Sequence, residues 1–129
     1  MVDSRSGKKI TSFTDLVAWQ VSHKLVIRVY EVSKTFPNEE KFGLTSQISR
    51  AVVSVTSNIA EGFGRNGSKE KDNFYALAYG SLLEVQNQLL VARDIGYISN
   101  ETFKELADMS VESAKLLSGL RKANKERNR

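Results

Sequence analysis

The chain has 129 residues, of which 40% are hydrophobic and 26% are charged, and it carries a formal net charge of +4. This composition is typical of one globular domain, which at this length can bury about two-thirds of the surface of its unfolded chain. The chain has no cysteine and a single histidine, His23, which excludes disulfides, thiolate catalysis and cysteine–zinc sites and argues against imidazole-based metal centres, so we expect neither a metal nor a cofactor.

The first predicted element is a flexible N-terminal segment over residues 1–12. Its first nine residues are polar and lack the apolar stretch of a signal peptide. No later run reaches the roughly 18 apolar residues that a membrane-spanning helix needs. We therefore expect a cytoplasmic protein that has no membrane partner.

The first long helix is predicted from about Thr14 to Phe36. Ser12 or Thr14 can cap it, because a side-chain oxygen accepts a hydrogen bond from the free amides of the first turn. Pro37, the single proline, ends the helix, because the residue before a proline is pushed out of the helical region. Its apolar residues recur at the spacing of one helix face: Val17, Val21, Leu25, Val29, Val32 and Phe36.

The second helix is predicted from about Thr45, its expected cap, to Gly62 or Gly64. Its many β-branched residues between Val52 and Ile59 also suggest a strand on propensity alone. The length of the segment and its period favour a helix, and packing routinely overrides propensity. The apolar stripe comprises Leu44, Ile48, Val52, Val55, Ile59 and Phe63.

The third helix is predicted from about Lys69 to Ile95, with Ser68 as its cap and Gly96 as its end. Its stripe comprises Phe74, Leu77, Ala78, Ser81, Leu82, Val85, Leu89 and Ala92. The fourth helix begins after Ser99 and frays into a basic tail. Its stripe comprises Phe103, Leu106, Ala107, Val111, Ala114, Leu117 and Leu120.

Short connections between long amphipathic helices favour antiparallel neighbours. We therefore predict an all-α fold, an antiparallel up-down-up-down four-helix bundle over residues 13–123, followed by a basic C-terminal tail over residues 124–129. The first and third helices carry apolar residues beyond one stripe, which favours self-association. This surplus comprises Trp19, Val26, Ile27, Tyr30, Tyr75, Tyr79, Leu83 and Leu90.

Glycines occur at two notable places. The segment from Gly62 to Gly67 spells GxGxxG, but a dinucleotide site needs that motif between a strand and a helix, and here a helix precedes it. We interpret these glycines as a helix C-cap and joint. Gly80 lies inside the third helix, where glycine costs roughly 1 kcal/mol relative to alanine, so we expect another helix to approach it closely.

Polar residues on the second helix form a possible internal site. Ser54, Asn58 and Glu61 share one helix face, and Glu84 lies on the next helix. Buried carboxylates in a bundle can bind iron, but His23 is not in the required Glu-x-x-His spacing. We expect a buried hydrogen-bonded network that includes Arg50, Asn58 or Tyr79, because an unpaired buried charge is very costly. A general acid–base pair of Glu61 and Glu84 stays the alternative.

Positive charge gathers at one joint and at the C-terminus. Clusters of this kind bind phosphate backbones by counterion release without reading sequence. No zinc finger, RNP1 motif or convincing helix-turn-helix accompanies them. The candidate nucleic-acid-binding residues are Arg50, Arg65, Lys69, Lys71, Arg121, Lys122, Lys125, Arg127 and Arg129.

Five segments between residues 13 and 98 together resemble a known family. They are Phe13-x-Asp15-Leu16-x-x-Trp19-Gln20; Phe36-Pro37-x-x-Glu40-x-Phe42-Gly43-Leu44-Thr45-x-Gln47-Ile48-x-Arg50-Ala51; Ser54-x-x-Ser57-Asn58-Ile59-Ala60-Glu61-Gly62-Phe63-Gly64-Arg65; Ala78-x-Gly80-Ser81-x-x-Glu84; and Gly96-Tyr97-Ile98. The chain resembles the four-helix-bundle proteins first described as encoded by intervening sequences in bacterial 23S rRNA genes, which are sometimes labelled as ribosomal proteins.

The resemblance implies a four-helix bundle that assembles as a ring-shaped homopentamer. It also implies a relationship to the accessory variability determinant of diversity-generating retroelements, a basic pentamer that works with a reverse transcriptase and nucleic acid. No biochemical activity is established for the wider family. The motif residues carry over as structural positions rather than a catalytic site: Ser54, Asn58, Glu61, Gly62, Gly80 and Glu84.

We therefore expect a non-enzymatic homopentamer that binds RNA or DNA through basic surfaces. Five copies would raise the net charge from +4 to about +20 and would add avidity without new contacts. One alternative is a protein-interaction scaffold in which the surplus aromatic residues form the working surface. Another is an enzyme that uses Glu61 and Glu84.

Overall fold

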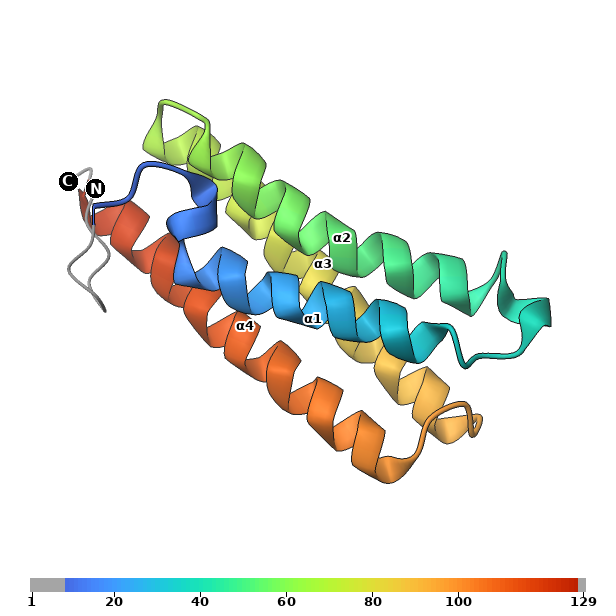
Figure 1. Ribbon diagram of the computed structural model, residues 1–129. Helices are drawn as coiled ribbons and strands as arrows, with labels where there is room; N and C mark the ends of the chain where they lie inside the picture. Colours follow the sequence, from blue (N-terminus) through green and yellow to red (C-terminus); the bar gives the residue numbers. More distant parts are fainter. Residues whose placement is uncertain (1–8, 128–129) are drawn as a thin grey trace.

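The computed structural model describes residues 9–127, which form four long helices and two short 3-10 helices. The long helices are α1 (Val17–Ser33), α2 (Leu44–Phe63), α3 (Ser68–Asp94) and α4 (Asn100–Arg127) (Figure 1). Helices α1 and α3 each pack against both α2 and α4, so α1 and α3 lie diagonally across the bundle. The fold is the predicted all-α four-helix bundle, and the segment from Val52 to Ile59 is helical within α2.

The start of the bundle is a 3-10 helix, η1 (Phe13–Asp15), that is separate from α1. Ser12 caps η1: its Oγ accepts from the Thr14 amide at 3.2 Å, and Asp15 Oδ2 accepts from the Ser12 amide at 3.1 Å. Leu16 then adopts an extended conformation, with a ψ of 126°, and breaks the helix. Helix α1 is therefore shorter at both ends than the predicted Thr14 to Phe36.

The connection between α1 and α2 contains the other 3-10 helix, η2 (Asn38–Glu40). Its last residue, Glu40, links this connection to the one between α3 and α4. Glu40 Oε1 accepts from the Leu44 amide at 3.2 Å, and Glu40 Oε2 accepts from Tyr97 Oη at 2.6 Å. The hydrogen bond from Tyr97 lowers the pKa of Glu40 most, and the hydrogen bond from the Leu44 amide lowers it further. The N-cap of α2 is Gly43 rather than the predicted Thr45, and Glu40 satisfies the first amide of the helix in place of a cap side chain.

The third helix begins and ends within one residue of the prediction. Its N-cap is Gly67 rather than Ser68, which is the first helical residue. At its other end Gly96 has a φ of 85°, a left-handed conformation that favours glycine, and the Tyr97 amide donates to the Ala92 carbonyl at 2.8 Å. Gly96 therefore ends the helix as predicted.

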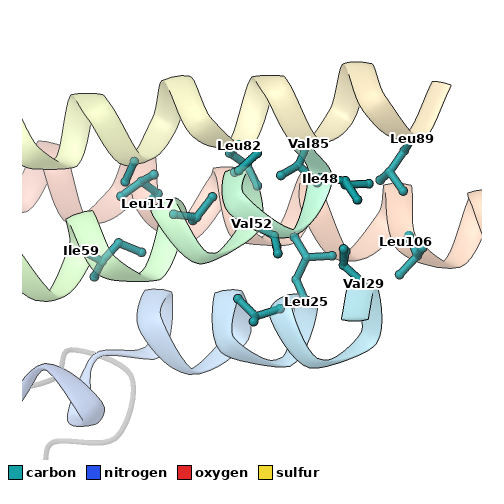
Figure 2. Packing of buried hydrophobic residues seen from close by; sticks show 14 of the residues in the cluster. Leu25, Val29, Ile48, Val52, Ile59, Leu82, Val85, Leu89, Leu106 and Leu117 are labelled. Atoms are coloured by element: carbon teal, nitrogen blue, oxygen red, sulfur yellow. The ribbon is translucent and has the colours of Figure 1, made fainter. Parts of the chain in front are cut away.

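The hydrophobic core runs along the bundle axis and receives residues from all four helices (Figure 2). Burial of each large aliphatic side chain contributes about 1.5–3 kcal/mol. The most fully buried aliphatic residues include Leu25, Val29, Ile48, Val52, Ile59, Leu82, Val85, Leu89, Leu106 and Leu117. Leu77 and Val111, which were predicted in the core stripes, are exposed, whereas Tyr75, predicted as surplus, is fully buried.

The bundle extends beyond the predicted range of residues 13–123 at both ends, because two residues outside that range are buried. Ile10, inside the predicted flexible segment, joins the core, and Asn124, inside the predicted tail, is buried on α4. Helix α4 continues through Lys125 to Arg127. In the part of the chain that the structure describes, no helix is long and apolar enough to cross a bilayer.

Candidate nucleic-acid interface

One end of the bundle carries most of the candidate basic residues. The α2–α3 joint and the end of α4 lie at the same end of the molecule (Figure 1). We call residues 61–72 and 118–127 the basic end, because they contain seven lysines and arginines against four carboxylates. The structure thus brings together the two clusters that are 46 residues or more apart in sequence.

Asn124 and Ser68 hold α4 against the start of α3. Asn124 Nδ2 donates to the Ser68 carbonyl at 2.9 Å, and Ser68 Oγ donates to the Asn124 carbonyl at 3.2 Å. The side chain of each residue donates to the backbone carbonyl of the other, so the contact forms only when the two helices are in this register. This reciprocal pair fixes the position of the last turns of α4, which carry Lys122, Lys125 and Arg127.

Arg121 and Asp72 form a second link between the same helices. The Arg121 guanidinium donates to both Asp72 oxygens, at 2.8 and 3.2 Å, and both side chains are more than two-thirds buried. The hydrogen bonds from Arg121 lower the pKa of Asp72, and nearby Lys125 lowers it further. Arg121 is therefore largely neutralised and positions the helix end rather than presenting an unpaired charge.

Lys71 is directed into the end of α2. Its Nζ donates to the Phe63 carbonyl at 2.6 Å and lies 5.4 Å from the centre of the Phe63 ring. Burial lowers the pKa of Lys71, and the positive charge of Arg127 lowers it further. A cation at a helix C-terminus satisfies free carbonyls and complements the helix dipole. Lys71 thus stabilises the joint.

Four exposed cations of the basic end have no ion pair within the described part of the chain. Lys69 lies in the first turn of α3, and Lys122, Lys125 and Arg127 lie in the last turns of α4; none forms an ion pair within 4 Å with another described residue. A shallow groove of about 420 Å³ runs beside Lys122 and Lys125. Arg65 is partly engaged, since its guanidinium lies 4.7 Å from the Phe74 ring centre and 3.7 Å from Glu61.

One of the predicted binding residues lies apart from the basic end, and another cannot be assigned to it. Arg50 is on the first half of α2, where it lines a different groove together with Glu84. Arg129 lies outside the described residues. The structure therefore unites Arg65, Lys69, Lys71, Arg121, Lys122, Lys125 and Arg127, and separates Arg50 from them.

The polar network on α2 includes the predicted Asn58 but not the predicted carboxylates. Ser54 Oγ lies 2.8 Å from Ser81 Oγ on α3, and Asn58 Nδ2 donates to the Ser54 carbonyl and Oγ at 2.8 and 3.0 Å. Glu61 and Glu84 are exposed and take no part in it. The prediction of a buried network around these carboxylates is wrong, because both are exposed to solvent. The hydroxyl groups of Ser54 and Ser81 instead form the polar contact between α2 and α3. Within residues 9–127 no cluster of acidic or histidine side chains could hold a metal ion.

Gly62 and Gly80 have opposite surroundings. A Cβ at Gly62 would lie 2.6 Å from Tyr75 Cε1, so this glycine permits the close contact of α2 with α3. A Cβ at Gly80 would meet nothing within 4 Å, so the prediction that another helix of the bundle approaches it is wrong. Sequence reasoning also missed Asp72 and Asn124, which resemble ordinary polar surface residues until their distant partners are known.

The fold and this end together define a class: small four-helix bundles with a positively charged end. A family model described as 23S rRNA-intervening sequence protein matches residues 14–119. The chain belongs to this family.

A solved structure supports the same fold. A protein of unknown function from the S23 ribosomal protein family of Bacteroides thetaiotaomicron VPI-5482 is 23% identical and superposes with a TM-score of 0.77. The match covers 82% of this chain and 99% of that chain, and at this identity it shows the fold alone. No curated protein matches the chain significantly.

Proposed function

We propose that this protein is a non-enzymatic homo-oligomer, a pentamer as the family resemblance implies, that binds the phosphate backbone of RNA or DNA through its basic end. The observation that carries the proposal is the group of exposed, unpaired cations Lys69, Lys122, Lys125 and Arg127. They lie on two helix ends that the Asn124–Ser68 and Arg121–Asp72 contacts hold together.

The charges of this end divide into two roles. Arg121 and Lys71 have partners in the bundle and keep the helix ends in place. The four exposed cations form no ion pair within 4 Å with another described residue, so a phosphate can replace their hydration and release counterions, which is the main source of sequence-independent affinity for nucleic acid. Contacts of this kind position a protein on a backbone without reading bases.

Assembly strengthens such an interface. One copy presents a few weak contacts, whereas an oligomer presents the same contacts several times, and the second and later contacts form at a high effective concentration. The absence of enzymatic function in the proposal rests on the exposed positions of Glu61 and Glu84, the two carboxylates of the alternative acid–base pair.

The experiment compares two triple variants with equal loss of charge. Lys122→Gln/Lys125→Gln/Arg127→Gln removes three cations from the basic end, and Lys34→Gln/Lys41→Gln/Lys104→Gln removes three exposed lysines from the opposite end. A fluorescent RNA hairpin and a DNA duplex of equal length are titrated at low salt. We expect the first variant to bind at least about tenfold more weakly and the second to bind as the wild type does.

Other outcomes would count against the proposal. Equal weakening in both variants would mean that net charge acts without a site. No binding by the wild type at low salt would reject nucleic-acid binding, and a protein partner captured under nuclease treatment would then support the interaction scaffold.

A further inference from the structure

One exposed cation of the basic end lies against an aromatic ring. Arg65 follows Gly64, the C-cap of α2, and its guanidinium lies over the ring of Phe74, 4.7 Å from the ring centre. Phe74 is in the second turn of α3 and is partly buried. The ring on the helix therefore supports a guanidinium that comes from the loop. We call this pair, Arg65 and Phe74, the stacking platform.

The outer side of the Arg65 guanidinium is open to a ligand. Glu61 Oε1 lies 3.7 Å from its nitrogen, which is longer than a hydrogen bond, and the arginine side chain is 42% exposed. Arg65 has no other ring contact or ion pair with a described residue. One side of the planar group is thus occupied by Phe74, and the opposite side is available.

The loop around Arg65 leaves room for a flat ligand. The four residues from Gly64 to Gly67 are exposed, and the two glycines carry no side chain. A Cβ at Gly67 would meet nothing within 4 Å, so the loop stands clear of the rest of the bundle there. The exposed cation Lys69 follows in the first turn of α3. A planar group over Arg65 therefore lies near a charge that suits a phosphate.

A guanidinium held over a ring offers more than a positive charge. Its plane stacks on other flat groups, whereas a lysine ammonium is a point charge without a plane. Unpaired bases stack on aromatic rings and on arginine planes, and proteins that bind single strands combine such platforms with cations that follow the backbone. Bases within a duplex stack on each other and present only their edges. The platform therefore suits an unpaired base.

We propose that the basic end binds an unpaired nucleotide, whose base stacks on Arg65 while Lys69 and the exposed cations of α4 contact the neighbouring phosphates. The platform gives this site a preference for single-stranded segments over a duplex. The platform contacts the base and not the sugar, so RNA and DNA strands are both ligands. This inference rests on the proposed function, for which it names the class of ligand.

The opposite end of the bundle contains a matched control. The Arg93 guanidinium lies over the Phe103 ring, 4.5 Å from the ring centre, near the α3–α4 connection (Figure 1). Arg93 also donates to Asp94 at 2.8 Å, so its charge is paired. This second pair has the arginine and the ring but lies away from the cations of the basic end.

The test compares two DNA strands of about 12 nucleotides that carry equal charge. One strand consists of thymidines, and the other has an abasic site in place of every base. Fluorescence anisotropy measures their binding to the full chain across a salt series. We expect the wild type to bind the thymidine strand at least about tenfold more tightly, because only this strand can stack. The two salt slopes should be similar, because both strands carry the same number of phosphates.

Arg65→Lys keeps the charge and removes the planar group. This variant should keep the wild-type affinity for the abasic strand and lose most of the preference for thymidines. Arg93→Lys makes the same change at the other pair and should keep the whole preference. Circular dichroism checks that both variants fold. A uridine strand of the same length should bind the wild type within about threefold of the thymidine strand, because the sugar is not read.

The inference is overturned if the wild type binds both DNA strands equally, if Arg65→Lys keeps the preference, or if Arg93→Lys loses it to the same extent. A difference between uridine and thymidine strands as large as the base preference would assign the selectivity to the ribose and would contradict stacking.

These outcomes are separate from those that test the proposed function. Equal, salt-dependent binding of both DNA strands would reject the platform and leave phosphate binding intact. Failure of the wild type to bind either strand or a duplex at low salt would reject both. Lys122→Gln/Lys125→Gln/Arg127→Gln should weaken both strands alike, because it removes phosphate contacts and leaves the platform in place.

Discussion

Gly62 on α2 and Tyr75 on α3 are in such close contact that a Cβ on the glycine would lie 2.6 Å from Tyr75 Cε1 and 3.1 Å from the Lys71 carbonyl. Burial raises the pKa of Tyr75 to about 12 and leaves its ring wedged between the helices. The contact brings the end of α2 against the start of α3. The position of the joint that carries Arg65 and Lys69 therefore depends on the missing side chain of Gly62.

Gly62→Ala should destabilise the protein by about 1–3 kcal/mol, because the added methyl group must push Tyr75 or the α3 backbone aside. Helix propensity alone predicts the opposite sign. The measurement is the urea unfolding midpoint. Gly119→Ala, at a helical position with no atom within 4 Å of the new Cβ, is the control and should gain up to about 1 kcal/mol. A stabilised Gly62→Ala would contradict the packing described.

Ser22 and Ser113 share a buried hydrogen bond of 2.5 Å between α1 and α4. Replacement of either residue by alanine leaves the other hydroxyl buried without this partner and should cost about 1–2 kcal/mol. The double alanine variant should cost less than the two single changes together, since no hydroxyl is then stranded. A thermodynamic cycle from urea unfolding measures this coupling, and strictly additive losses would show that the two groups do not interact.

The Arg121–Asp72 pair predicts a specific acid response. Its hydrogen bonds lower the pKa of Asp72 in the folded chain below the usual 3.8. The ionised carboxylate therefore stabilises the fold above this value, and the contribution is lost as the pH falls through the folded pKa. Asp72→Asn should lose about 1 kcal/mol at pH 7 and show a shallower further loss in acid than the wild type.

Unfolding midpoints at pH 7 and about pH 3 test this response. Arg121→Gln should behave like Asp72→Asn, because either change removes the same pair. A wild-type and an Asp72→Asn curve that stay parallel across the acid range would show that Asp72 titrates normally in the folded protein.

Lys71 and Lys69 are two residues apart in sequence, and the structure assigns them different roles. Lys71 donates to the Phe63 carbonyl, so Lys71→Met should lose about 0.3–1 kcal/mol of stability and change nucleic-acid affinity little. Lys69 is exposed, so Lys69→Met should weaken nucleic-acid binding and change the stability little. Paired measurements of unfolding and of binding decide this. A larger affinity loss in Lys71→Met than in Lys69→Met would contradict the division.

The helices themselves were predictable because their period and punctuation agree. Gly96 ends α3 as predicted, whereas α1 already ends at Ser33 rather than at Pro37. The apolar spacing between Val52 and Ile59 outweighs the strand propensity of these residues, and the segment is helical. The ends of the helices were not predictable in detail. Leu16 adopts an extended backbone conformation between η1 and α1, and no pattern in the sequence indicates this break. Glu40 satisfies an amide four residues away, which a search for adjacent cap residues does not find.

The candidate site was only partly predictable. Charge clusters at the joint and at the C-terminus are visible in the sequence, but their union depends on helix pairing across Asn124 and Ser68. The surroundings of Gly80 and Glu84 depend on the rotation of α3, which a stripe of apolar residues leaves uncertain when the helix is apolar on several sides. Leu77 was placed inward and Tyr75 outward for the same reason.

The most direct test of the central claim, that the basic end binds phosphate backbones, is the salt dependence of duplex DNA binding. For the wild type we expect log K to fall linearly with log salt concentration. The slope of Lys122→Gln/Lys125→Gln/Arg127→Gln should be shallower by about 2 to 3, since each phosphate contact contributes roughly 0.9. The slope of Lys34→Gln/Lys41→Gln/Lys104→Gln should equal that of the wild type. A wild-type slope near zero, or equal slopes in all three proteins, would contradict the claim.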